Sequence, residues 1–215
     1  MVSVRALCVL IAALVVITGC AGPRGQYFTT EGLIIPTGIC PIPPSSLGIA
    51  EQLPPINERN GCQVPNPWQV ESVATVSFNR PAKLNCGMVS PLASWFQDSV
   101  QPAAKSAFGE EVVSVNVLAS YACRPRNNHW GGKLSEHGFG NAIDIGGFTL
   151  ASGRTVTVRS GWAGAPDEQQ FLRSVRHDAC QTFSTVLGPG SDGNHEDHFH
   201  LDMMARKSGR SAYCG

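Results

Sequence analysis

Two segments of the chain alternate polar and apolar residues in the pattern typical of β-strands that have one polar face. Near the C-terminus, His198, His200 and Asp202 share one parity, and the residues between them are apolar. Earlier in the chain, Asp144 stands between two isoleucines. Successive side chains of a strand point to opposite faces of its sheet, so both histidines should lie on the same side. The fold therefore needs a sheet with one core face and one polar face.

The same two segments gather residues that bind metal ions. Three of the six histidines lie within 195–200. His137 lies just before the strand of Asp144, and Gly138 and Gly140 allow a tight backbone that turns its ring toward the carboxylate. Imidazole and carboxylate ligands that leave one coordination position open are typical of catalytic zinc. The pattern predicts a zinc site, and the clustering disfavours the alternative of unrelated loop histidines.

The residues also resemble a known family. The spacing of the Ser-x-His-x-x-Gly-x-Ala-x-Asp signature is reproduced by Ser135, His137, Gly140, Ala142 and Asp144. This signature is found in the zinc peptidase group that includes D-alanyl-D-alanine peptidases and penicillin-insensitive murein endopeptidases. His198 and His200 match the second signature of that group. The run 120–126, followed by the first signature and by Cys214 near the end, resembles the bacterial extensin-like C-terminal domain family over about residues 60–215.

The resemblance implies a role for each matching position. It implies that His137, Asp144 and His200 bind one zinc ion. It also implies that His198 is the general base, which takes a proton from the attacking water.

Residues around these positions receive supporting roles. Arg124, or its competitor Arg126, would stabilise an oxyanion or bind a substrate carboxylate, although either could be an ordinary surface arginine. Asp197 would hold an imidazole in one tautomer. His195 would contact substrate or orient the base, and a solvated loop histidine is the equal alternative. Ser135 belongs to the same supporting or substrate-binding group.

The function that the resemblance implies is a zinc-dependent hydrolase. It would cleave peptide bonds of peptidoglycan as a murein endopeptidase or carboxypeptidase. The alternative is a non-catalytic peptidoglycan-binding or structural envelope lipoprotein on the same fold, because a fold and its metal site can outlive catalysis. Lys plus Arg and Asp plus Glu balance at 16 each, and no basic run or aromatic platform indicates nucleic acid as a partner.

The N-terminus predicts export. Arg5 precedes an apolar stretch over 6–17 that is too short to span a bilayer comfortably and is typical of a signal peptide. The sequence that follows resembles a bacterial lipoprotein box, with Cys20 as the lipidated residue and 1–19 as the signal peptide. An ordinary signal peptide cut near Ala21 is the alternative. We therefore expect a cell-envelope protein that faces the periplasm and is held at a membrane by its N-terminal lipid.

Six cysteines remain in the predicted exported part after Cys20. They are Cys40, Cys62, Cys86, Cys123, Cys180 and Cys214. An even number of widely spaced cysteines outside the cytoplasm predicts three disulfides, for which about fifteen pairings exist. Free buried thiols are the alternative, which an oxidising compartment disfavours.

The remaining sequence predicts a tether followed by one domain. Nine of the fifteen prolines lie within 21–67, so residues 20–60 are interpreted as a Pro-rich tether and 61–215 as the zinc peptidase-like domain. Helices are expected to begin at Ser90, with a break or kink at Pro102, and to run from Glu168 to Leu187. Strands are expected near 113–117 and as a hairpin over 142–149 and 154–159. The predicted class is α+β, with helices packed on a small antiparallel sheet that carries the zinc site and is stapled by disulfides.

Overall fold

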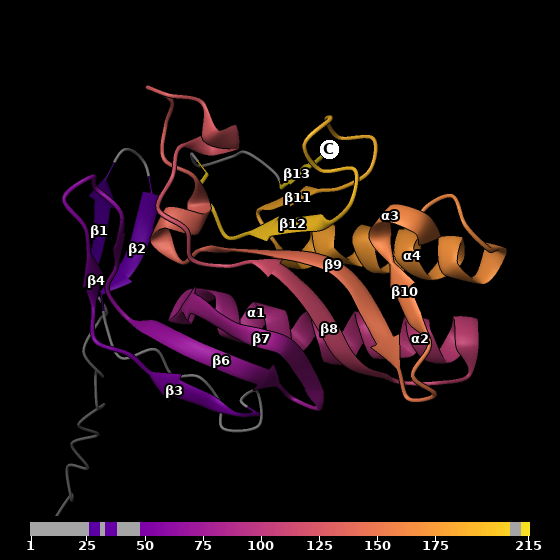
Figure 1. Cartoon of the computed structure of the whole chain (residues 1–215). Helices are drawn as coiled ribbons and strands as arrows, with labels where there is room; N and C mark the ends of the chain where they lie inside the picture. The colour runs from indigo at the N-terminus through magenta and orange to yellow at the C-terminus, as the bar shows by residue number, and fades with distance from the viewer. Residues whose placement is uncertain (1–25, 31–32, 38–47, 207–211) are drawn as a thin grey trace, which may run out of the picture.

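A mostly antiparallel sheet forms the centre of the molecule (Figure 1). The computed structural model describes residues 26–30, 33–37, 48–206 and 212–215. In spatial order the strands are β13 (Tyr213–Cys214), β11 (Thr185–Leu187), β12 (Phe199–Asp202), β9 (Ala142–Leu150), β8 (Val112–Ala119), β7 (Val76–Asn85), β6 (Pro67–Val73) and β3 (Ala50–Gln52), with β10 (Thr155–Thr157) paired to β9. Among these described strands, β7 pairs with β8 and β11 with β13 in parallel. The predicted α+β class is confirmed, although the sheet is larger than expected and not purely antiparallel.

Helices cover one face of this sheet (Figure 1). The helical segments are α1 (Cys86–Trp95), the π-helical turn η2 (Phe96–Val100), α2 (Gln101–Phe108), the short 3₁₀ turns η3 (Arg126–Asn128) and η4 (Glu136–Phe139), α3 (Val158–Gly161) and α4 (Pro166–Thr182). Trp95 is fully buried beside Phe148 of β9, and its indole nitrogen donates to the Val175 carbonyl of α4, 2.9 Å away. The apolar face of the sheet is thus closed, which leaves the opposite face of β9 and β12 for polar side chains. No helix in the described ranges combines the length and apolar character that crossing a membrane requires.

The first predicted helix begins earlier than expected and does not stop at either proline. Helix α1 starts at Cys86 and contains Pro91. Pro102 lies in the first turn of α2, directly after the π-helical turn. A proline in a first turn lacks an N–H that such a turn would leave without a helical partner anyway. The segment therefore changes its hydrogen-bond pattern without ending.

The predicted helix over 168–187 is too long at its C-terminal end. Helix α4 ends at Thr182, and Phe183 has extended backbone angles (φ −105°, ψ 155°). Val186 belongs to β11, which pairs antiparallel with β12. A strand forms here in place of the expected helix because Val186 is buried in the core when it lies in β11, so the extended segment keeps the burial that the helix would have given. The hairpin of β9 and β10 is formed as predicted, but its second strand ends at Thr157, and residues 158–159 belong to α3.

Ordered structure begins before residue 61. Strand β3 pairs antiparallel with β6 at the edge of the main sheet. Two further pairs are formed by β1 (Gln26–Thr30) with β2 (Leu33–Thr37) and by β4 (Ile56–Asn57) with β5 (Gln63–Val64). Part of the segment interpreted as a tether is therefore strand. The predicted signal peptide, Cys20 and Cys40 lie outside the described residues.

Disulfides connect distant parts of the fold. Cys62 is bonded to Cys123, and Cys180 to Cys214. Cys86 is disulfide-bonded as well. The first bridge lies directly against the turn that carries His137, since a Cβ on Gly138 would come within 2.7 Å of the Cys62 sulfur. The predicted use of cysteines as staples is confirmed for these five residues.

Candidate metal centre

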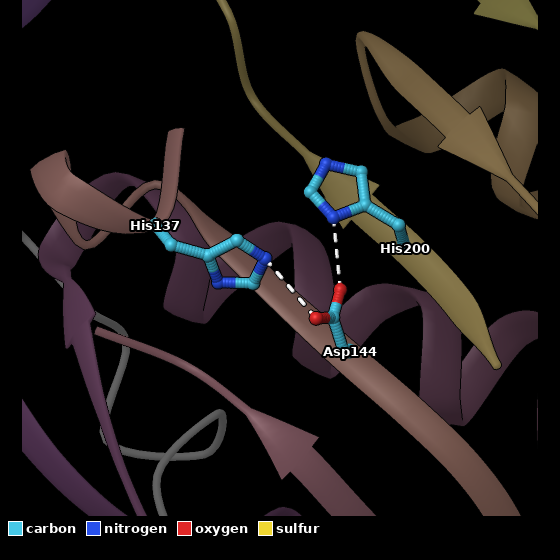
Figure 2. Close-up of side chains that lie close together, drawn as sticks. All are labelled: His137, Asp144 and His200. Atoms are coloured by element: carbon cyan, nitrogen blue, oxygen red, sulfur yellow. Dashed lines mark hydrogen bonds and ion pairs between the residues drawn. The ribbon is translucent and has the colours of Figure 1, made fainter. Parts of the chain in front are cut away.

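Strand register places His200 beside Asp144. The two residues are Cα partners on the antiparallel neighbours β12 and β9, so their side chains project from the same face of the sheet. His137 comes from η4, which is followed by Gly140 with a left-handed φ of 61°. This conformation favours glycine and lets the chain turn directly into β9. The three side chains converge as Figure 2 shows.

The carboxylate of Asp144 lies between the two imidazole rings. His137 Nε2 is 3.2 Å from Asp144 Oδ2, and His200 Nδ1 is 2.8 Å from Asp144 Oδ1 (Figure 2). One ligand atom from each of the three residues lies within 4.8 Å of the others, and all three residues are buried. This group could bind a metal ion. Two imidazole nitrogens and one carboxylate oxygen are a donor set that suits zinc.

Each imidazole has a second partner on its other nitrogen. His137 Nδ1 donates to the Ser120 carbonyl oxygen at 2.6 Å, so a neutral His137 carries its lone pair on Nε2, toward Asp144. His200 Nε2 lies 3.2 Å from Asp202 Oδ2, which leaves Nδ1 as the inward nitrogen. Such outer partners fix the tautomer of metal-binding histidines. The residues present therefore fit a metal ion, because both lone pairs can point to the same place.

Electrostatics keep a proton at this site when no metal is bound. Burial opposes ionisation of Asp144, yet its hydrogen bonds with His137 and His200 hold its pKa well below the ordinary range. Burial also disfavours a charged His200, but hydrogen bonds with Asp144 and Asp202 prevail and raise its pKa to about 9. At neutral pH, the metal-free His200 is therefore a cation between two carboxylates.

The other two histidines of the cluster border the ligand group. His198 Nδ1 is 2.7 Å from Asp197 Oδ1, and its Nε2 faces Asp144 Oδ1 at 3.7 Å. Asp197 also accepts from Arg159 at 2.9 Å. His195 is buried, and its ring centroid lies 5.2 Å from that of His198. Its burial lowers the pKa of His195, against the effect of the Asp192 carboxylate 2.7 Å from its Nδ1.

The three candidate ligands line a cavity of about 470 Å³ together with His195 and His198. Arg124 and Arg126 lie on the wall formed by the loop after β8. Arg126 forms an ion pair with Glu136 Oε1 at 3.1 Å, whereas the guanidinium of Arg124 contacts the Pro125 carbonyl at 3.5 Å. Ser135 is buried at the same wall. The structure thus places the predicted ligands, His195, His198, Arg124, Arg126 and Ser135 at this cavity, whereas Asp197 is not among the lining residues and contacts His198. Arg124 is the arginine whose charge is not neutralised by Glu136.

The sequence assigned no role to several residues that line this cavity, among them Asp202, Glu136 and Arg206. Asp202 shares the parity of His198 and His200, and this alternation is the signal that could have marked it as a partner of His200. Glu136 is buried, and burial together with the charge of Asp202 raises its pKa. Arg206 carries no recognisable sequence signal, because its anchors, the Ser184 carbonyl and Thr185 Oγ1, lie more than twenty residues earlier in the chain.

Comparison with known families extends the sequence prediction. A family model described as "Extensin-like protein C-terminus" matches residues 44–215. The chain belongs to this family. The match begins at residue 44, whereas the resemblance noted in the sequence covered about 60–215, and this agrees with the position of β3 in the main sheet. No curated protein and no solved structure gives a significant match.

Proposed function

We propose that this extensin-like domain is a zinc-dependent peptidase that cleaves peptide bonds of peptidoglycan. The observation that supports this most is that the imidazoles of His137 and His200 both face the carboxylate of Asp144. Each imidazole directs one nitrogen to Asp144 and has an oxygen partner on the other. A closed structural zinc site uses four protein ligands, whereas three ligands beside a cavity suit a catalytic site.

The neighbouring residues have the chemistry that amide hydrolysis needs. A zinc ion in this site would supply Lewis-acid activation of water and of the amide carbonyl. His198 donates a hydrogen bond from its Nδ1–H to Asp197 Oδ1, so its Nε2 can accept a proton from an attacking water and return it to the leaving amine. Arg124, on the cavity wall, can bind the oxygen on which negative charge develops. A non-catalytic binder would not need this base beside the ligands.

Digestion of intact peptidoglycan tests the proposal. Zinc-loaded protein should release peptide or disaccharide-peptide products that mass spectrometry identifies, and the products would show which bond is cut. Chelator-treated protein is the matched control. If zinc-loaded protein sediments with peptidoglycan and releases nothing, the binding function replaces the peptidase.

Replacing Asp202 should lower the affinity for zinc more than it slows peptide-bond cleavage. Asp202→Asn removes the carboxylate that holds Nε2 of His200, so we expect zinc affinity to fall about 10- to 100-fold. Asp197→Asn is the matched control, because Asp197 contacts His198 and no proposed ligand. Competition titration with a zinc-binding dye measures both. Equal zinc affinities for the two variants would contradict this role of Asp202.

We also propose that the protein is exported and lipid-anchored through Cys20. The support is the N-terminal sequence, together with disulfides, which are typical of oxidising compartments. In a bacterial host, labelled fatty acid should enter the wild-type protein and be absent from Cys20→Ala. Equal labelling of the two proteins, or no labelling of the wild type, would contradict the proposed lipid anchor at Cys20.

A further inference from the structure

Arg206 places a further guanidinium group at the cavity that Arg124 and Arg126 also line. It is anchored to the start of β11, where its Nε donates to the Ser184 carbonyl at 2.8 Å and its Nη2 to Thr185 Oγ1 at 2.9 Å. Thr185 is the Cα partner of Asp202 on β12. Neighbouring strands lie about 4.8 Å apart, so Arg206 is held one strand beyond the strand of His200.

The partners of Arg206 fix its position without neutralising it. Its guanidinium carbon lies 5.9 Å from the centre of the Tyr213 ring, and both residues line the cavity. Its hydrogen-bond acceptors are a carbonyl and a hydroxyl, and within the described ranges it forms no ion pair with a carboxylate. Arg126 differs, because Glu136 compensates its charge. Arg206 is therefore a half-buried cation in a fixed orientation, and some of its N–H donors are not used by these two hydrogen bonds.

The carboxylates of the cavity are already engaged. Asp144 and Asp202 contact His200, and Asp192 contacts His195. An arginine carries five N–H donors in a planar fork that matches a carboxylate, and the two known contacts of Arg206 leave part of that fork available. The group that fits the available donors of Arg206 is therefore an anion of a bound ligand.

We infer that Arg206 is a subsite for a carboxylate of the substrate, in the cavity that Arg124 also lines. The inference rests on the proposed peptidase function and narrows its substrate class to peptides that carry a free carboxylate beside the bond that reacts. Tyr213 supports the guanidinium from one side, and Thr185 sets its distance from the ligand strand. The subsite would select acidic stem peptides over the same peptides with amidated carboxyl groups.

A cycle of two changes tests this subsite. The probes are a synthetic stem pentapeptide as the free acid and the same peptide amidated at every carboxyl group. Two zinc-loaded mature proteins, one with Arg206 and one with Arg206→Gln, would each be titrated calorimetrically with each probe. All proteins in the series carry His198→Ala, so that bound peptide is not consumed. Because charge-assisted hydrogen bonds are the stronger kind, Arg206→Gln should weaken binding of the free acid about tenfold or more and leave binding of the amide almost unchanged.

Two further variants keep the outcome clear. Arg173→Gln is the matched control, because Arg173 also stacks on an aromatic ring, that of Trp162, and donates to neutral acceptors, but does not line the cavity. It should bind both probes normally. Arg206→Lys keeps the charge without the fork and should retain part of the preference for the free acid.

The possible results separate this inference from the proposed function. If Arg206→Gln affects both probes equally or neither, while wild-type protein still releases peptides from peptidoglycan, the subsite is wrong and the peptidase stands. If the His198→Ala protein with Arg206 intact does not bind the free acid, and wild-type protein does not digest peptidoglycan, both the subsite and the proposed peptidase function are wrong. Zinc content and thermal unfolding of each variant show that the fold is intact.

Discussion

We expect His137→Ala and His200→Ala to lose nearly all bound zinc, whereas the wild-type protein should hold about one zinc ion per chain. Each histidine supplies one of three ligands, and the lost imidazole cannot be replaced by its outer partner, a backbone carbonyl or Asp202. Elemental analysis after dialysis measures the effect. His177→Ala is the matched control, because His177 is exposed on α4 and away from the cavity. Zinc contents equal to wild type in both variants would show that these histidines are not ligands.

Zinc binding should also release a proton. Contacts with two carboxylates raise the pKa of His200 to about 9, so its imidazole is protonated at neutral pH without metal. A metal ligand needs the lone pair of Nδ1, and binding therefore expels that proton. The apparent zinc affinity should rise as the pH is raised from neutral toward 9 and then level off for this group. A pH-indicator dye in weak buffer detects the release, and His200→Ala should not show this proton release.

The residues of the site were largely predictable, but their contacts were not. The parity of His198, His200 and Asp202 placed polar side chains on one face of a strand. Nothing local showed that β12 would pair with β9 in the register that sets His200 opposite Asp144. Register between strands more than fifty residues apart is decided by how both bury their apolar faces.

The errors in the fold also have physical reasons. Phe183 and Val186 continue a helical spacing, yet they are core residues of an extended segment because β12 offers a hydrogen-bonding edge to β11. Residues 20–60 were interpreted as a tether because this region is rich in proline and shows little periodic apolar pattern. Strand β3 contains no proline and occupies the edge of the sheet.

Arg206 shows the same limit of sequence analysis. Its anchors are a carbonyl and a hydroxyl from near β11, about twenty residues earlier in the chain. An arginine gains a fixed position from such contacts only after the strands have assembled. Arg124 could be proposed from a family likeness, whereas Arg206 needed the assembled sheet.

The base should be separable from the ligands. We expect His198→Ala to keep its fold and its zinc and to lose turnover on peptidoglycan peptides by about 10²-fold or more, the usual contribution of general base catalysis. The reason is geometric, because His198 Nε2 lies beside Asp144, and its Nδ1 is occupied by Asp197. Rates of peptide release at matched zinc content measure the effect.

Two companion variants make that result specific to proton transfer. Asp197→Asn should keep zinc and lose a smaller part of the turnover, because the Asn side chain still reaches Nδ1 but no longer offers a charged acceptor. His129→Ala, which removes an exposed histidine of the neighbouring loop, should behave as wild type. If His198→Ala loses zinc together with activity, His198 is a ligand, and the base must be sought elsewhere in the cavity. If it keeps both zinc and turnover, His198 takes no part in the reaction, and His195, whose ring lies 5.6 Å from that of His200, becomes the next residue to replace.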